Sequence, residues 1–217
     1  MNNQVVISIK DLCKKINNMY ILKDISVDFK KGNIYGIIGR NGSGKTMLFK
    51  AICGLINPTS GTINVFNKNI KDGTFPDDTG VIIENPGFLP QYSAFKNLKI
   101  LASIKNKIDD ETIKKYIKLV TLDPDDKRPI KKYSLGMKQK LGIAQALMEN
   151  PRLLILDEPM NSLDEDSVHL VRKILLNLKS TGITILLASH NKDDIEQLCD
   201  CIYTMDVGKL SLNTNNK

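Results

Sequence analysis

Residues 33–50 read Asn-Ile-Tyr-Gly-Ile-Ile-Gly-Arg-Asn-Gly-Ser-Gly-Lys-Thr-Met-Leu-Phe-Lys. A short apolar run leads into a glycine-rich loop, and the segment after the loop has the apolar spacing of a helix. Gly39, Gly44, Lys45 and Thr46 match the phosphate-loop pattern of glycine, four residues, glycine, lysine and then serine or threonine. An ordinary glycine-rich turn is the alternative, but the strand before the loop and the helix after it favour a nucleotide-binding loop.

The residue types of this loop suit a triphosphate. Backbone N–H groups can crowd around phosphate oxygens only where no Cβ blocks the approach, and glycines meet that need. The helix predicted to begin at Lys45 points its positive dipole end at the anion, Lys45 can bridge the outer phosphates, and Thr46 can hold Mg²⁺. We therefore predict ATP and Mg²⁺ as ligands, and the predicted nucleotide-binding residues of the loop are Gly39, Asn41, Gly42, Ser43, Gly44, Lys45 and Thr46.

Composition bounds the class of protein. A chain of 217 residues with 41% hydrophobic content is long enough for one domain with a sizeable core. No apolar run approaches the roughly 20 residues that a membrane span needs, and the first ten residues do not resemble a signal peptide, so we expect a soluble cytoplasmic protein. The net charge is +7, but the lysines are scattered among few aromatics, which disfavours nucleic acid as a partner. The four cysteines lack zinc-site spacing, so reduced thiols are expected.

The apolar pattern changes along the chain. Alternation at 5–9, 25–29 and 63–65 predicts three half-buried strands of an antiparallel sheet. Pro58, Ser60 and Gly61 indicate a turn before the third of them. From about residue 88 to 150 the character is helical, which indicates an inserted helical subdomain within a single domain that spans 1–217.

Two apolar segments, 153–156 and 183–188, read as buried strands of a parallel sheet. Asp157 and Glu158 follow the first, and His190 follows the second. Glu84 comes after a shorter strand near 81–83. Ligands of open α/β sheets bind at the carboxyl ends of the strands, and paired acids there are costly to bury without a cation. The sequence therefore predicts that Asp157 and Glu158 serve a metal and an attacking water, and it places Glu84 at the ligand-binding end of the sheet.

Taken together, these motifs resemble the ATP-binding subunit of an ABC transporter over essentially the whole chain. Residues 39–46 are similar to the Walker A loop, 153–157 to Walker B, 133–144 to the ABC signature, 162–164 to the D-loop, and His190 to the switch histidine. The chain most resembles the bacteriocin, lantibiotic and bacitracin export or self-immunity ATPases, because it combines Glu-Asn-Pro-Gly-Phe at 84–88 with Ser-Leu-Gly-Met at 134–137. This implies an α/β fold with a P-loop NTPase core, whose parallel sheet is flanked by helices, an antiparallel β subdomain and the helical subdomain.

The resemblance also implies roles and partners. Thr46 and Asp157 would hold Mg²⁺, Glu158 would polarise the attacking water, and His190 would orient that water or the γ-phosphate. Ser134 and Gly136 would meet the γ-phosphate of the ATP bound by a second subunit, in a homodimer or heterodimer of ATP-binding subunits. Transmembrane permease subunits would hold this dimer at the cytoplasmic face of the membrane and convert its closure and reopening into transport.

The chain departs from the family pattern at three places. Glu84 stands where the wider family has glutamine, and its carboxylate can still hold Mg²⁺ or position water. The signature differs from Leu-Ser-Gly-Gly-Gln at three of five positions, although Ser134 and Gly136 remain. Ile16 occupies the position at which the family usually has an aromatic residue that stacks on adenine. Tyr20 is the candidate substitute for this stacking, and the alternative is that Tyr20 only packs within its strand.

Three functions are compatible with these features. The first is the ATPase subunit of an exporter or immunity transporter for a peptide-like antibiotic. The second is a soluble ABC ATPase that acts on ribosomes or DNA, which the single cassette and the short helical insertion disfavour. The third is a nucleotide-gated module with little turnover, which the intact Lys45, Asp157, Glu158 and His190 disfavour. The transported molecule and the identity of the partner cassette stay open.

Overall fold

The computed structural model describes residues 4–71 and 73–214, and in this part of the chain the strands form two sheets. The first is a four-stranded antiparallel sheet in the order β2-β1-β4-β5. Its strands are β1 (Val5–Ile16), β2 (Met19–Lys30), β4 (Ser60–Val65) and β5 (Lys68–Asn69). The three antiparallel strands predicted from alternation are confirmed.

The second sheet has six strands in the order β10-β9-β3-β8-β7-β6. The neighbours from β9 to β6 are parallel, and only the edge pair of β9 and β10 is antiparallel. The strands are β3 (Ile34–Ile38), β6 (Thr79–Ile82), β7 (Leu153–Asp157), β8 (Thr184–Ala188), β9 (Cys201–Asp206) and β10 (Lys209–Leu212). Every residue of β7 and of β8 is buried, as their continuous apolar composition predicts.

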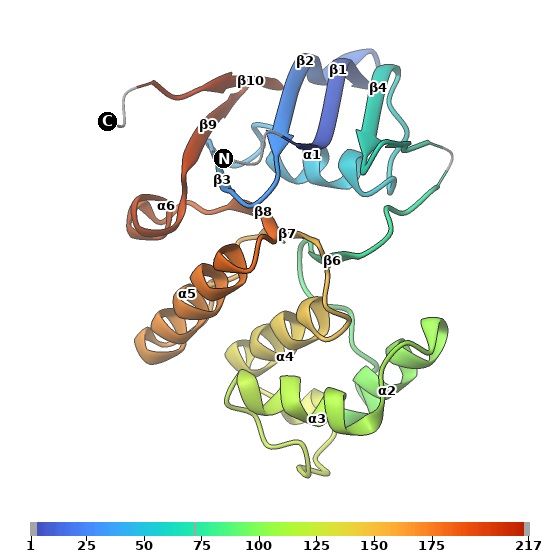
Figure 1. The fold of residues 1–217 in the computed structure, drawn as a ribbon, viewed down its shortest axis with the longest axis vertical. Coiled ribbons are helices and arrows are strands. Elements are labelled where there is room, and N and C mark those ends of the chain that lie inside the picture. The colour runs from blue at the N-terminus through green and yellow to red at the C-terminus, as the bar shows by residue number, and fades with distance from the viewer. Residues whose placement is uncertain (1–3, 72, 215–217) are drawn as a thin grey trace.

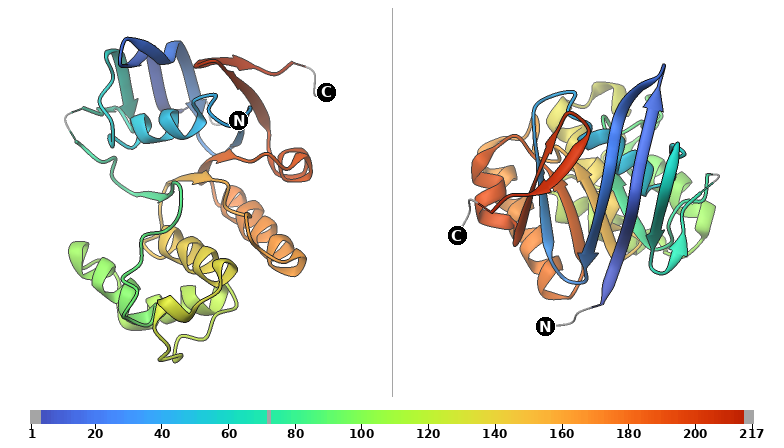
Figure 2. Two further views of the ribbon diagram at one scale, coloured as in Figure 1. Left: turned by 180° about the vertical axis from the view of Figure 1, so that it is seen from behind. Right: turned by 90° about the horizontal axis from the view of Figure 1, so that it is seen from above.

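Six α-helices lie in the described residues. They are α1 (Lys45–Ile52), α2 (Ala94–Lys105), α3 (Asp110–Leu119), α4 (Leu135–Leu147), α5 (Glu165–Ser180) and α6 (Lys192–Leu198), and a short 3-10 helix spans Ile130–Lys132. Helix α1 lies between the two sheets, whereas α2, α3 and α4 gather at the opposite end of the molecule (Figures 1 and 2). None of the helices in the described ranges is long and apolar enough to cross a membrane.

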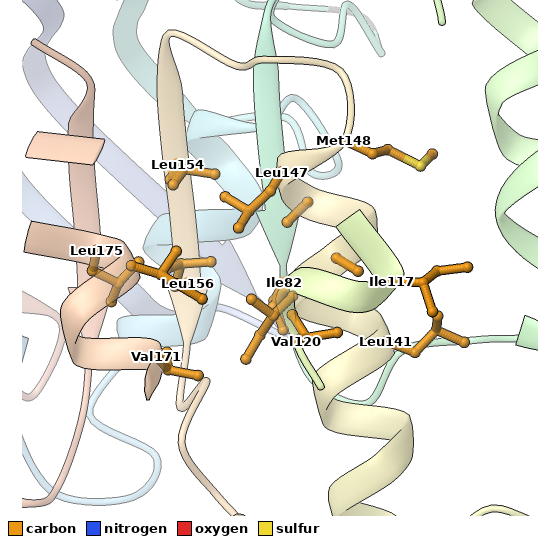
Figure 3. Packing of buried hydrophobic residues seen from close by; sticks show 14 of the residues in the cluster. Ile82, Ile117, Val120, Leu141, Leu147, Met148, Leu154, Leu156, Val171 and Leu175 are labelled. Atoms are coloured by element: carbon orange, nitrogen blue, oxygen red, sulfur yellow. The ribbon is translucent and has the colours of Figure 1, made fainter. Parts of the chain in front are cut away.

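Alternate side chains of β7 serve two separate cores. Leu153 and Ile155 belong to the core around α1 and the antiparallel sheet. Leu154 and Leu156 belong to the core that α3, α4 and α5 close from the other side (Figure 3). This strand therefore joins both halves of the molecule, and its last residue is Asp157.

The second core attaches the helical insertion to the sheet. Ile117 of α3 and Leu141 of α4 face each other, and Leu147 of α4 packs toward the β6–β7 edge of the sheet (Figure 3). Burying a leucine or isoleucine side chain contributes about 1.5–3 kcal/mol relative to leaving it exposed, so these contacts hold the insertion firmly on the sheet.

The turn predicted at Pro58, Ser60 and Gly61 is wrong in its second half, because Ser60 and Gly61 belong to β4. Gly61 has φ +85°, and a Cβ there would lie 2.3 Å from the carbonyl oxygen of Asp11 on β1. The pairing of β1 with β4 shifts register at this place. The glycine thus marks a bulge in the sheet, not the end of a strand.

Candidate active site

The loop between β3 and α1 has the backbone geometry of an anion cradle. Gly44, directly before α1, has φ +114°, and a Cβ there would lie 2.9 Å from the carbonyl oxygen of Ile21. Gly42 has φ +79° and faces open space, with no atom within 4 Å of the position of a Cβ. Left-handed backbone of this kind favours glycine and leaves N–H groups exposed to a ligand.

Two polar side chains of the loop fit a bound anion. The ammonium of Lys45 donates hydrogen bonds to the carbonyl oxygens of Gly39 at 2.8 Å and Arg40 at 3.3 Å. Ser43 Oγ is buried and has no hydrogen-bond partner among the described residues. An unpaired buried hydroxyl is costly, and a phosphate oxygen would satisfy it. The cradle therefore fits the polyphosphate that the sequence predicts.

An open cavity of about 1060 Å³ lies beside the loop. Its lining joins residues from distant parts of the chain: Ile16, Ile21, Asn41, Gly42, Gly44, Lys45, Thr46, Met47, Glu84, Asn85, Pro86, Leu135, Lys138, Gln139, Asp157, Glu158, Asn161 and Ser162. Most of the predicted loop and carboxylate residues are therefore brought together at one cavity.

Thr46 and Asp157 meet at the base of this cavity. Thr46 Oγ1, in the first turn of α1, donates to Asp157 Oδ2 at 2.6 Å, at the end of β7. Both atoms are hard oxygen ligands of the kind that Mg²⁺ prefers. No group of three or more His, Cys, Asp or Glu that could hold a metal occurs in residues 4–71 and 73–214. A cation here would thus have few protein ligands, as Mg²⁺ does when phosphates and water complete its shell.

Glu158 and His190 form a second pair at the ends of β7 and β8. His190 Nδ1 lies 2.8 Å from Glu158 Oε2, and the His190 backbone N–H donates to the same oxygen at 3.3 Å. The histidine side chain is 67% exposed and the glutamate side chain 22%. Glu158 lines the large cavity, while His190 lines an adjoining one with Gly39 and Arg40. A carboxylate held by an imidazole can accept a proton or align a water molecule.

Glu84 is held by a lysine that the sequence reasoning missed. Its Oε1 lies 2.6 Å from the ammonium of Lys50 in the last turn of α1. Lys50 follows Thr46 by one helical turn, a spacing that could have placed it near the site. The carboxylate is 63% exposed and its residue lines the cavity, so it stays available to a ligand.

Three residues that line the cavity hold left-handed backbone conformations without being glycine. Glu84 has φ 60°, Glu158 has φ 51° and Ser162 has φ 65°. Such conformations cost free energy and persist only where the surrounding structure imposes them, and they cluster at functional sites. Eleven other non-glycine residues with positive φ in the described part of the chain lie outside this cavity, so the conformation supports a functional role here only together with the polar lining.

Two residues of the signature segment, Ser134 and Gly136, lie outside the cavity. Ser134 caps α4, where its Oγ accepts a hydrogen bond from the Met137 N–H at 3.1 Å, and it is exposed. A Cβ on Gly136 would lie 2.7 Å from the carbonyl oxygen of Ser162, so this glycine packs directly against the 162–164 segment. Neither residue lines the cavity of its own chain. Their predicted contact with the nucleotide of a second subunit stays a prediction.

The structure places Tyr20 outside the cavity. Its ring lies under the ammonium of Lys15, 4.4 Å from the ring centroid, and near that of Lys23 at 5.6 Å. Ile16 and Ile21 line the cavity in its place. Aliphatic side chains on this wall could pack against a purine base, and stacking by Tyr20 stays a prediction.

Gln139 is another residue that the sequence reasoning did not single out. Its Nε2, on α4, donates to the backbone carbonyls of Pro159 at 2.9 Å and Glu158 at 3.3 Å. Helix α4 is thereby tied to the segment that carries Glu158. The only signal for this contact in the sequence was the position of Gln139 within the signature segment.

Comparison with known proteins agrees with the motifs. The family model described as ABC transporter matches residues 22–161. The uncharacterized ABC transporter ATP-binding protein YybJ of Bacillus subtilis is 48% identical, and the match covers 94% of each chain.

Two further relatives have names that include a transported compound. The bacitracin transport ATP-binding protein BcrA of Enterococcus faecalis is 39% identical over 98% of this chain and 70% of its own. The lantibiotic transport ATP-binding protein SrtF of Streptococcus pyogenes is 38% identical over 95% and 90%.

A solved structure shares the fold. The structure described as an ATP-binding subunit of an ABC transporter superposes with a TM-score of 0.88, at 26% identity, over 97% of this chain and 90% of that one. The predicted α/β fold, with its parallel sheet flanked by helices, is confirmed.

Proposed function

This chain belongs to the ABC transporter family, and we propose that it is the ATP-hydrolysing subunit of a transporter that exports, or confers self-immunity to, a peptide-like antibiotic. The observation that carries the proposal is the convergence of the phosphate loop, the Thr46–Asp157 pair and Glu158 on one cavity. The substrate class rests on the similarity to BcrA and SrtF along nearly the whole chain.

ATP would bind with its phosphates in the loop of residues 39–46. The exposed N–H groups and the α1 dipole would hold the anion, and Ser43 Oγ would gain the partner that it lacks. Lys45 would exchange its hydrogen bonds with Gly39 and Arg40 for bonds with phosphate oxygens. Because the ammonium of Lys45 already lies against the loop, this exchange needs little change in the conformation of the side chain.

Thr46 and Asp157 would hold Mg²⁺, with Glu84 as a further ligand or as a water-positioning group. When bound, the ion neutralises charge on the transferring phosphoryl group. Lys50 offsets the negative charge that Glu84 adds near the phosphates, since the two side chains are paired at 2.6 Å.

Glu158 would accept a hydrogen bond from the water that attacks the γ-phosphorus, while the bond from that phosphorus to the bridging oxygen breaks and ADP leaves with the electron pair. His190 holds the Glu158 carboxylate and would orient the water or the γ-phosphate. These roles need a site closed to bulk water, and the cavity of the single chain is open.

A second cassette, identical or closely related, would close the site. Ser134 is exposed and outside the cavity, which suits contact with the nucleotide of the partner cassette in a head-to-tail dimer. In this arrangement residues 1–217 act as one ATP-binding domain, and the helical subdomain at about 88–150 carries the signature. Permease subunits would anchor the dimer at the cytoplasmic face of the membrane.

The test combines two variants with reconstitution. Lys45→Ala should abolish ATP binding, whereas Glu158→Gln should bind ATP, lose turnover and accumulate dimers in size-exclusion chromatography. Cognate permease subunits should stimulate the wild-type ATPase, and cells that express the complex should tolerate more bacitracin or lantibiotic than cells with the Glu158→Gln complex. Unchanged turnover in Glu158→Gln would remove its catalytic role. An ATPase that ignores the permease would instead favour a soluble ABC ATPase or nucleotide-gated module.

A further inference from the structure

A buried ion pair lies behind the site, between two helices that follow the sheet strands β7 and β8. Arg172 of α5 is 9% exposed and Asp194 of α6 is 1% exposed. Arg172 donates from Nε and Nη2 to Asp194 Oδ1, at 2.9 Å and 2.6 Å, and its Nη1 donates to Gln197 Oε1 at 3.2 Å. The charge of the carboxylate is thus balanced on one of its two oxygens.

The other oxygen of this carboxylate reaches the loop that carries His190. Ser189 Oγ donates to Asp194 Oδ2 at 3.0 Å, and the same hydroxyl accepts a hydrogen bond from the Asn191 N–H at 3.1 Å. Ser189 is 4% exposed. The residues immediately before and after His190 are therefore both tied, directly or through one hydroxyl, to Asp194.

His190 itself has few other restraints. Its side chain is 67% exposed, and both its imidazole and its backbone N–H contact the Glu158 carboxylate. An exposed imidazole keeps its position chiefly through the backbone that bears it. Any motion of the 189–191 loop would therefore change the distance between the imidazole and Glu158 directly.

Stability alone is a weak explanation of the ion pair. Desolvation of two buried charges offsets most of their attraction, so well-packed apolar residues of similar volume are often equally stable in such places. What the pair does supply is fixed geometry, because each donor and acceptor bonds in a defined direction.

We propose that Arg172, Asp194 and Ser189 form a positioning network that fixes the β8–α6 loop, so that the His190 imidazole is held against the Glu158 carboxylate. The inference rests on the catalytic role of His190 proposed above. None of the three residues lines the large cavity, although Ser189 lines the cavity of His190 beside Gly39 and Arg40. In this proposal the network acts on hydrolysis through His190.

The decisive experiment replaces the ion pair by apolar residues and repeats this without the histidine. Arg172→Met with Asp194→Leu removes both charges together, so that no unpaired charge is left buried. We expect kcat to fall about tenfold, with KM for ATP unchanged. This loss is smaller than the roughly 10²-fold loss of kcat expected for His190→Ala. In the His190→Ala background the apolar pair should cause no further loss, because the residue through which it acts is gone.

Two further variants complete the design. Ser189→Ala removes a single hydroxyl, and it should lower kcat by a smaller factor even if the apolar pair folds poorly. Lys179→Met is the matched control, since it breaks an ion pair of the same helix with Asp200, away from the His190 loop, and should leave kcat unchanged.

The outcomes separate the inference from the proposed function. If His190→Ala leaves kcat unchanged, the catalytic role of the histidine fails and the network loses its purpose with it. If His190→Ala lowers kcat but the apolar pair and Ser189→Ala do not, or lower it equally in both backgrounds, the positioning network is refuted while the ATPase mechanism stands.

Discussion

Replacing Gly80 by alanine should destabilise the protein through one backbone contact. Gly80 is buried in β6, and a Cβ there would lie 1.9 Å from the carbonyl oxygen of Ala146 in α4 and 2.8 Å from Leu154 Cδ2. A carbon atom this close to an oxygen is far inside contact distance, so α4 would have to retreat from the sheet by about 1 Å.

The magnitude follows from two opposing effects. Overpacking a tight interface costs about 1–3 kcal/mol, and a rigid backbone obstacle favours the upper part of that range. Alanine also restricts the unfolded chain, which returns about 0.4–1 kcal/mol. The net loss in the free energy of unfolding should be about 1–2 kcal/mol. With a urea m-value of about 2 kcal/mol/M, the unfolding midpoint should fall by about 0.5–1 M.

The chain has no tryptophan, so far-UV circular dichroism is the suitable probe of urea unfolding. Gly87→Ala is the matched control, because Gly87 is exposed and a Cβ there would meet nothing within 4 Å. Its midpoint should stay level or rise slightly. Equal midpoints for the Gly80→Ala and Gly87→Ala variants would refute the argument that α4 is seated against β6 by this glycine.

Three other predictions concern thiols and charges. Burial raises the pKa of Cys53 and of Cys199 to about 12. At pH 8 iodoacetamide should therefore label both thiols at least about 100-fold more slowly in the native protein than in urea, as measured by mass spectrometry. Equal labelling rates in the two conditions would contradict the burial of these thiols. Because both pKa values are raised on folding, the two thiols stabilise the native state fully below pH 9, and that stabilisation should decline between pH 9 and 12. Lys50→Ala and Glu84→Gln, measured singly and together by urea unfolding, should show a coupling of only about 0.2–1 kcal/mol that high salt weakens, since the Glu84 side chain is 63% exposed and that of Lys50 26%. A coupling that high salt leaves unchanged would contradict this.

Local signals in the sequence determined the elements and the residue types of the site. The phosphate loop is readable because its left-handed backbone needs Gly42 and Gly44 whatever surrounds it. Helix α5 is readable because Asp164 caps its first turn and its apolar face repeats every three to four residues. The misplaced turn at Gly61 shows the limit of such signals, since a glycine in a turn and a glycine in a bulge look alike until the neighbouring strand is known.

Only the tertiary structure decided which side chains meet. Glu158 and His190 lie 32 positions apart, Glu84 and Lys50 lie 34 apart, and Arg172 and Asp194 lie 22 apart. Periodicity reveals which face of an element is buried, but the partner on the other side depends on strand order and on how helices seat against the sheet. For the same reason the sequence could suggest a bound triphosphate with magnesium, whereas the pairing of Lys50 with Glu84 and the network behind His190 emerged only once the chain was folded.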